Sequence, residues 1–204
     1  MTNFKNKMEP FDRKKHWEKI YQTKQLNEVS WYQPTPETSL QFINDFKISK
    51  SANIIDVGGG DSLFVDHLLD LGFTNVTVLD ISEAALERAK KRLAEKSKLV
   101  TWIVADAVNF VPMQPYDFWH DRAAFHFLTS EQDIQQYLKT VQANLTAHGV
   151  FVLGTFSDTG PTKCSGIEIK QYSEKNMHNR LSVYFEKIKC LVVDHKTPSN
   201  KIQN

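Results

Sequence analysis

The chain has 204 residues, of which 41% are hydrophobic and 24% charged, a length and composition typical of one globular domain with a buried core. Its 25 basic and 24 acidic side chains give a formal charge of +1, so no overall field would attract nucleic acid or an anionic membrane. Two cysteines, Cys164 and Cys190, are too few for a disulfide framework and lack the spacing of zinc ligands, so we expect reduced thiols and no metal.

The N-terminal residues carry charges where a signal peptide would have its apolar run. No later stretch reaches the roughly 20 apolar residues that cross a bilayer. We therefore expect a cytoplasmic protein with no membrane partner and no nucleic-acid partner, present as a monomer or a homodimer.

The N-terminal segment, residues 1–34, is polar and aromatic and contains no apolar run of strand length. A helix is predicted over residues 36–47, with Thr35 as its N-cap and Pro36 in the first helical position. The N-terminal segment is therefore predicted to be an appendage to a main domain formed by residues 35–204.

Predicted strands and helices then alternate along the main domain. The strands are expected at residues 53–57, 76–80, 99–106, 116–121 and 149–156, and the helices at residues 62–71, 82–93 and 130–145. Nearly continuous apolar strands separated by amphipathic helices predict an α/β fold, in which a doubly wound, mostly parallel sheet has helices on both faces.

The C-terminal part of the pattern is less regular. A loop rich in glycine, serine, threonine and proline covers residues 157–166, a helix is predicted from Ser173 to Phe185, and a sixth strand is predicted over residues 187–194. After that strand, residues 201–204 could begin another strand but not complete one.

Acidic residues close four successive strands of this pattern. They are Asp56, Asp80, Asp106 and Asp121. Ligands of an open doubly wound sheet bind beyond the carboxyl ends of its strands, so these carboxylates predict a ligand that is cationic or rich in hydroxyl and amino donors. S-adenosylmethionine has this character, with its sulfonium, its ammonium, two ribose hydroxyls and an adenine amine.

The turn after the first strand contains three consecutive glycines, Gly58, Gly59 and Gly60. A dinucleotide fingerprint would need a further glycine where the chain has Leu63, and Asp61 would lie beside the pyrophosphate. A phosphate-binding loop would need a lysine that this turn does not have. These departures argue against a dinucleotide oxidoreductase, although this function stays open as an alternative.

At these residues, and over about residues 50–155, the sequence resembles the class I S-adenosylmethionine-dependent methyltransferases, which have a Rossmann-like fold. The resemblance implies that the cofactor leaves as S-adenosylhomocysteine. It also implies a set of cofactor-binding residues at the strand ends, consisting of Asp56, Gly58, Gly60, Asp80, Ile81, Asp106, Ala107, Asp121 and Arg122.

The resemblance gives each part of this set a role. The glycine turn and Asp56 would hold the methionine moiety. Asp80 would bind the ribose, with Ile81 beside the adenine. The next strand end, Asp106 and its neighbour, would hold the adenine amine, whereas Asp121 and Arg122 would lie at the methionine end and near the acceptor.

Aromatic residues of the N-terminal segment extend the resemblance. Trp17, Tyr21 and Trp31 occur as in methyltransferase-like enzymes that include small bacterial proteins and eukaryotic protein-lysine methyltransferases. Trp17 and Tyr21 are four residues apart and would share one helix face, and the equivalent aromatics contact the cofactor in those relatives. An alternative interpretation is that they only anchor the segment, which we expect to cover the cofactor, to the core.

The methyl acceptor is the least defined part of the prediction, because in-line methyl transfer needs alignment and no signature nucleophile. The Asn/Asp-Pro-Pro-Tyr/Phe motif of nucleic-acid and release-factor methyltransferases is replaced by residues 120–125. This difference argues against nucleic-acid and release-factor acceptors, and it leaves a small molecule or a protein side chain as the methyl acceptor. Arg122, His126 and residues 157–166 are predicted to line the acceptor site, with Arg122 and His126 as candidate catalytic residues; His126 could instead be structural.

Two further expectations follow from the resemblance. A catalytically silent module, which binds the cofactor as the partner of another methyltransferase, stays open as an alternative function. The family's sheet also ends with a hairpin whose last strand is antiparallel, and residues 201–204 are too few to form it. We therefore expect this strand to be missing, so that the sheet edge is open or is completed by a partner.

Overall fold

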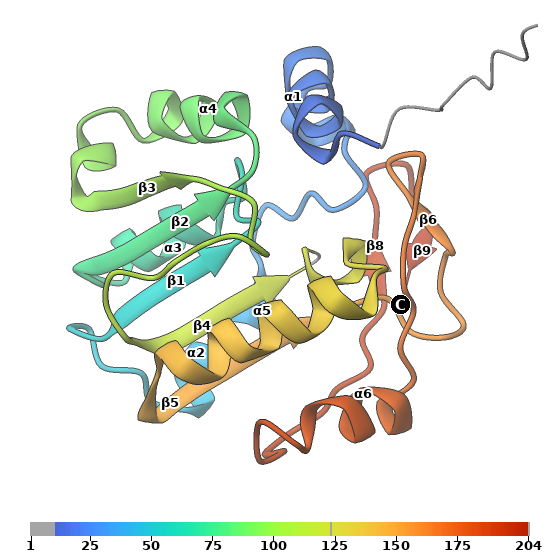
Figure 1. Cartoon of the computed structure of the whole chain (residues 1–204). Helices are drawn as coiled ribbons and strands as arrows, with labels where there is room; N and C mark the ends of the chain where they lie inside the picture. The colour runs from blue at the N-terminus through green and yellow to red at the C-terminus, as the bar shows by residue number, and fades with distance from the viewer. Residues whose placement is uncertain (1–10, 123, 204) are drawn as a thin grey trace, which may run out of the picture.

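The computed structural model of the chain describes residues 11–122 and 124–203, which form a parallel sheet between two layers of helices (Figure 1). The sheet has five strands, β1 Asn53–Val57, β2 Asn75–Asp80, β3 Val100–Val104, β4 Tyr116–Arg122 and β5 Leu145–Gly154. They hydrogen-bond in the order β3-β2-β1-β4-β5, all in parallel. The predicted fold is confirmed, and the strand order reverses between β1 and β4, where such sheets bind their ligands.

The two faces of the sheet are covered by different helices. The helices are α1 Arg13–Thr23, α2 Glu37–Asp45, α3 Phe64–Asp70, α4 Glu83–Leu93, α5 Glu131–Asn144 and α6 Glu174–Leu181. Ile55 packs in one cluster with Ile134 and Leu138 of α5. Its neighbour Ile54 packs in the other cluster with Phe64 and Leu68 of α3. Successive residues of β1 therefore contribute to opposite sides of the core, as the pleat of a strand requires.

The start of α2 differs from the prediction by one residue. Pro36 occupies the N-cap position and α2 begins at Glu37, so Thr35 is not the cap. The ψ angle of Pro36 is 69°, outside the helical region, and the Glu37 N–H donates to the carbonyl of Thr35 at 2.9 Å. This tight turn delays the helix by one residue.

The predicted sixth strand is wrong, because residues 187–194 form no strand in the structure. Ile188 and Val192 are 68% and 73% exposed, so the burial that stabilises apolar residues in a strand is missing. The helix before this segment, α6, ends at Leu181 rather than at Phe185. Within the described residues, all strand pairs of the main sheet are parallel.

Two short antiparallel strand pairs lie outside the main sheet. β6 Lys163–Cys164 pairs with β7 Ile167–Glu168, and β8 His195–Lys196 pairs with β9 Ile202–Gln203. Both cysteines are free thiols, as expected. None of the helices formed by residues 11–122 and 124–203 has the length and apolar character that a membrane span needs.

Candidate cofactor site

A cavity of about 1050 Å³ opens at the carboxyl ends of the strands and extends along β5. It is lined by most of the residues that the sequence predicted for the site, namely Trp17, Tyr21, Trp31, Gly58, Asp80, Ile81, Asp106, Ala107, Arg122 and His126. The loop at residues 157–166 contributes Ser157, Asp158 and Cys164. The fold therefore brings the N-terminal segment, the ends of β1, β2, β3 and β4 and this loop together around one space.

The glycine turn after β1 has a backbone that other residues rarely adopt. Gly58 and Gly60 have φ angles of 67° and 49°, in the left-handed region that favours glycine. A Cβ atom at Gly58 would lie 2.6 Å from the Cβ of Ala124. A Cβ atom at Gly60 would lie 2.6 Å from the hydroxyl of Tyr21. The turn is therefore closely packed on both the β4 side and the N-terminal side.

Asp80 ends β2 and lies directly beside this turn. Its Oδ1 accepts a hydrogen bond from the Ser82 N–H at 2.8 Å, and its Oδ2 would lie 3.1 Å from a Cβ added at Gly60. Burial raises the pKa of Asp80 to about 7, and the nearby charges of Asp61 and Asp56 act in the same direction. The site thus holds a carboxyl group that titrates near neutral pH.

Two other strand-end acids, Asp56 and Asp121, lie outside the cavity lining. His120 bridges Asp56 and Ser39, with its Nδ1 2.7 Å from Asp56 Oδ1 and its Nε2 2.9 Å from Ser39 Oγ. This contact ties the end of β1 to β4 and to α2. The assignment of Asp56 and Asp121 to the cofactor stays a prediction.

The carboxylate of Asp121 organises the loop that follows β4. It accepts hydrogen bonds from the N–H groups of Ala124 and Phe125 and from the Tyr137 hydroxyl, the last at 2.6 Å. Burial raises the pKa of Asp121 to about 6 against the opposing effect of these donors. Asp121 therefore fixes the loop that carries Ala124 and, beyond it, His126.

Asp106 lies two residues beyond the last residue of β3, at the other end of the site. Its Oδ1 accepts a hydrogen bond from the Val108 N–H at 3.0 Å, and its Oδ2 is 3.3 Å from a guanidinium nitrogen of Arg13. The same nitrogen is 3.2 Å from Asp133 of α5. The role of Arg13 could not be predicted from the sequence, because its two partners are far away in the chain.

Aromatic rings from α1, from the loop after it and from the segment after β4 line one side of the cavity. The ring centroid of Trp17 is 6.2 Å from that of Tyr21, 5.7 Å from that of Trp31 and 4.9 Å from that of Phe127. Phe127 was missed by the sequence analysis, which had no signal to separate it from other apolar residues. The shared helix face predicted for Trp17 and Tyr21 is present.

The two candidate catalytic residues have different surroundings. Arg122 donates to the carbonyl of Trp31 at 3.0 Å, so it connects the end of β4 to the N-terminal segment. His126 is 1% exposed, and among the described residues neither of its ring nitrogens has a hydrogen-bond partner. Burial lowers the pKa of His126 to about 3, which keeps the imidazole neutral beside the rings of Phe127 and Phe156.

Comparison with known protein sequences agrees with this geometry. Residues 55–151 match the model of a methyltransferase domain family. EEF1A lysine methyltransferase 2 of Danio rerio is 25% identical over 155 residues, which cover 69% of this chain and 66% of that protein. Malonyl-[acyl-carrier protein] O-methyltransferase 1 of Ilyobacter polytropus is 31% identical over 111 residues, 53% of this chain and 40% of that protein. The chain thus matches less than two thirds of these relatives.

Solved structures share the fold at low sequence identity. The 1,6-didemethyltoxoflavin-N1-methyltransferase of Burkholderia thailandensis is 16% identical, with a TM-score of 0.73 over 93% of this chain and 83% of that chain. A DhpI–SAM–HEP complex is 14% identical, with a TM-score of 0.61 over 85% of this chain and 90% of that chain. Residues 55–151 thus match a methyltransferase domain, the relatives in sequence are methyltransferases, and the solved structures share the fold of this chain.

Proposed function

We propose that this chain transfers a methyl group from S-adenosylmethionine to a small molecule or a protein side chain and releases S-adenosylhomocysteine. The observation that carries the proposal is the meeting of the glycine turn, Asp80 and the aromatic rings of α1 at one cavity. We further propose that it acts in the cytoplasm, as a monomer or homodimer, without a nucleic-acid partner.

The residues around the cavity fit this cofactor. The Asp80 carboxylate would accept hydrogen bonds from the ribose hydroxyls, and Ile81 would lie beside the adenine. Asp106 with Ala107 would hold the adenine amine. Gly58 lines the cavity, so the backbone of the glycine turn would lie beside the methionine moiety.

The N-terminal segment, residues 1–34, is proposed to cover the bound cofactor; residues 1–10 lie outside the described part of the chain. Trp17 and Tyr21 support this role, since both line the cavity and aromatic faces attract a cationic sulfonium. The cofactor supplies an activated methyl group, and the protein has to align the acceptor with it at about 3–3.5 Å.

The catalytic roles proposed for Arg122 and His126 differ. Arg122 donates to the carbonyl of Trp31 and would lie at the methionine end of the site. His126 can accept a hydrogen bond from the acceptor because its imidazole is neutral and unpartnered among the described residues. Neither role needs a covalent intermediate.

The enzyme is favoured over the silent cofactor-binding module, because the relatives named above are all methyltransferases. By their names, those relatives act on a lysine of EEF1A, on malonyl-[acyl-carrier protein] and on 1,6-didemethyltoxoflavin. Their variety supports an acceptor among proteins or small molecules and does not select one.

The proposal is tested by incubating the protein with a cell extract and methyl-labelled S-adenosylmethionine. Label should appear in precipitated protein or in the soluble small-molecule fraction, and these outcomes distinguish the two acceptor classes. His126→Ala should lower the transfer rate by about 10²-fold while S-adenosylhomocysteine binds as before. Unchanged transfer in both His126→Ala and Arg122→Ala would remove the catalytic assignment, and no transfer by the native protein would count against the enzyme.

A further inference from the structure

Helix α1 is attached to α4 at the N-terminal end of α4. The Glu18 carboxylate of α1 accepts hydrogen bonds from the Glu83 N–H at 2.6 Å and from the Ala84 N–H at 3.1 Å. The first N–H groups of a helix have no partner within the helix and carry its positive dipole end, so a carboxylate is well suited to them. Glu18 therefore caps a helix that lies 65 residues further along the chain.

A second contact runs in the opposite direction. Arg88 of α4 donates to the carbonyl of Tyr21 at 2.9 Å and to that of Lys24 at 2.7 Å, at the C-terminal end of α1. Carbonyls in the last turn of a helix lack helical partners, and a cation complements the negative end of the dipole. The two helices are thus joined by an acid from α1 and a base from α4.

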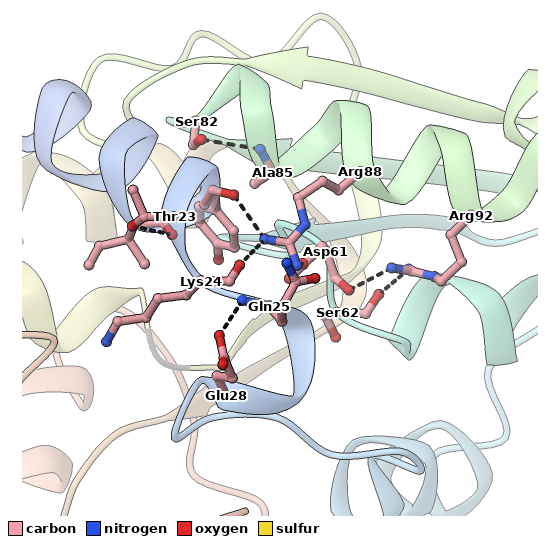
Figure 2. Close-up of polar contacts among 12 residues, drawn as sticks. Thr23, Lys24, Gln25, Glu28, Asp61, Ser62, Ser82, Ala85, Arg88 and Arg92 are labelled. Atoms are coloured by element: carbon pink, nitrogen blue, oxygen red, sulfur yellow. Dashed lines mark hydrogen bonds and ion pairs between the residues drawn. The ribbon is translucent and has the colours of Figure 1, made fainter.

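Arg88 also reaches the glycine turn. One of its nitrogens is 2.9 Å from Oδ2 of Asp61, whose side chain is only 2% exposed. Figure 2 shows Arg88 between Lys24 of the N-terminal segment and Asp61 of the turn. A single side chain therefore connects α4, α1 and the loop that follows β1.

This arrangement bears directly on the cofactor site, because Arg88 and the site contact the same residue. The carbonyl of Tyr21 accepts the hydrogen bond from Arg88, while its hydroxyl lies against Gly60. Trp17, which also lines the cavity, precedes Glu18 in the chain. Moving α1 away from α4 would therefore shift both aromatic rings.

We propose that Glu18 and Arg88 form a clasp that fixes α1 over the cofactor, so that both are positioning residues for cofactor binding. This inference rests on the proposed function for the identity of the ligand. The clasp itself is independent of it, since it joins α1 to α4 whatever the cavity binds.

A simpler explanation is that Arg88 serves only to neutralise Asp61. Among the described residues, Asp61 Oδ1 is buried without a hydrogen-bond partner, so loss of Arg88 would leave a poorly compensated buried charge. The double variant Arg88→Met/Asp61→Asn separates the two explanations. It keeps the turn neutral but still deprives the α1 carbonyls of their donor.

The experiment measures S-adenosylhomocysteine affinity and dissociation rate together with amide hydrogen exchange of residues 13–24. Glu18→Gln, Arg88→Ala and the double variant should each raise Kd by about tenfold, mainly through faster dissociation, and should speed exchange in α1. Lys91→Ala, which removes an exposed cation from the same helix, should change neither quantity. Thermal unfolding checks that each variant is folded. If Arg88→Ala does not fold, Glu18→Gln alone tests the proposal.

Native affinity in the double variant would overturn the proposal and assign Arg88 to Asp61 alone. Native affinity and native exchange in Glu18→Gln and Arg88→Ala would also overturn it. If the native protein does not bind S-adenosylhomocysteine, the proposed function fails. Hydrogen exchange then tests the clasp by itself. Faster α1 exchange in the variants than in the native protein supports the clasp, and unchanged exchange refutes it.

Discussion

Residues with the same position in the sequence pattern have different surroundings in the fold. Asp80 and Asp121 both close a strand, and both are buried acids with a raised pKa. Asp121 is surrounded by three donors, one of them from Tyr137 of α5, whereas Asp80 lines the cavity. The difference comes from partners that the local sequence does not contain.

The pKa of Asp80 predicts a pH dependence of cofactor binding. Hydrogen-bond donors such as ribose hydroxyls favour the ionised carboxylate of Asp80. Since the pKa of Asp80 is about 7, this carboxyl group is mostly protonated in the free protein below pH 7. Affinity for S-adenosylhomocysteine should therefore fall as the pH drops from 8 to 6, by about tenfold. Titration calorimetry at each pH measures this, and Asp80→Asn should remove most of the dependence. A wild-type profile as flat as that of Asp80→Asn would contradict the assignment.

The Tyr137 hydroxyl should matter for stability rather than for the ligand. In Tyr137→Phe, the buried Asp121 loses a donor at 2.6 Å and Trp119 loses an acceptor. We expect the free energy of unfolding to fall by about 1–3 kcal/mol in urea titrations at pH 8. At that pH Asp121 is ionised, since its pKa is about 6. A change below about 0.5 kcal/mol would show that Asp121 does not depend on this bond.

At the scale of elements, the turn between β1 and α3 decides how closely α1 approaches the sheet. Gly60 combines a positive φ angle with contact to the Tyr21 hydroxyl, whereas Gly72, with a φ angle of 85°, has no atom within 4 Å of an added Cβ. The two glycines share the backbone requirement and differ in the contact. They form a matched pair for a substitution experiment.

Gly60→Ala and Gly72→Ala should therefore have different effects on binding. Both variants should lose about 1–2 kcal/mol of stability through left-handed backbone strain. Only Gly60→Ala should also weaken S-adenosylhomocysteine binding, because its Cβ displaces Tyr21. Chemical denaturation and calorimetry on both variants measure the two effects. Equal affinity in the two variants would mean that the contact between Tyr21 and the turn is unimportant for the site.

At the scale of the whole molecule, the central sheet could be predicted because its strands are apolar and its helices are amphipathic. The C-terminal part could not be predicted in the same way. Residues 187–194 are of types that favour strands, but they lack a buried surface to pack against. The site was predicted from strand ends and a glycine turn, which are local signals. Arg13, Phe127 and Arg88 were missed because they act through contacts between distant segments.

We propose that the cavity at the switch point binds S-adenosylmethionine through Asp80. The most direct measurement is isothermal titration of the native protein with S-adenosylmethionine, S-adenosylhomocysteine and NADH, repeated with Asp80→Ala and with Asp70→Ala, an exposed acid, as control. We expect micromolar binding of both adenosyl ligands, native affinity in Asp70→Ala and a loss of at least about tenfold, ~1.4 kcal/mol, in Asp80→Ala. A folded native protein that binds neither adenosyl ligand, or that prefers NADH, would contradict the claim.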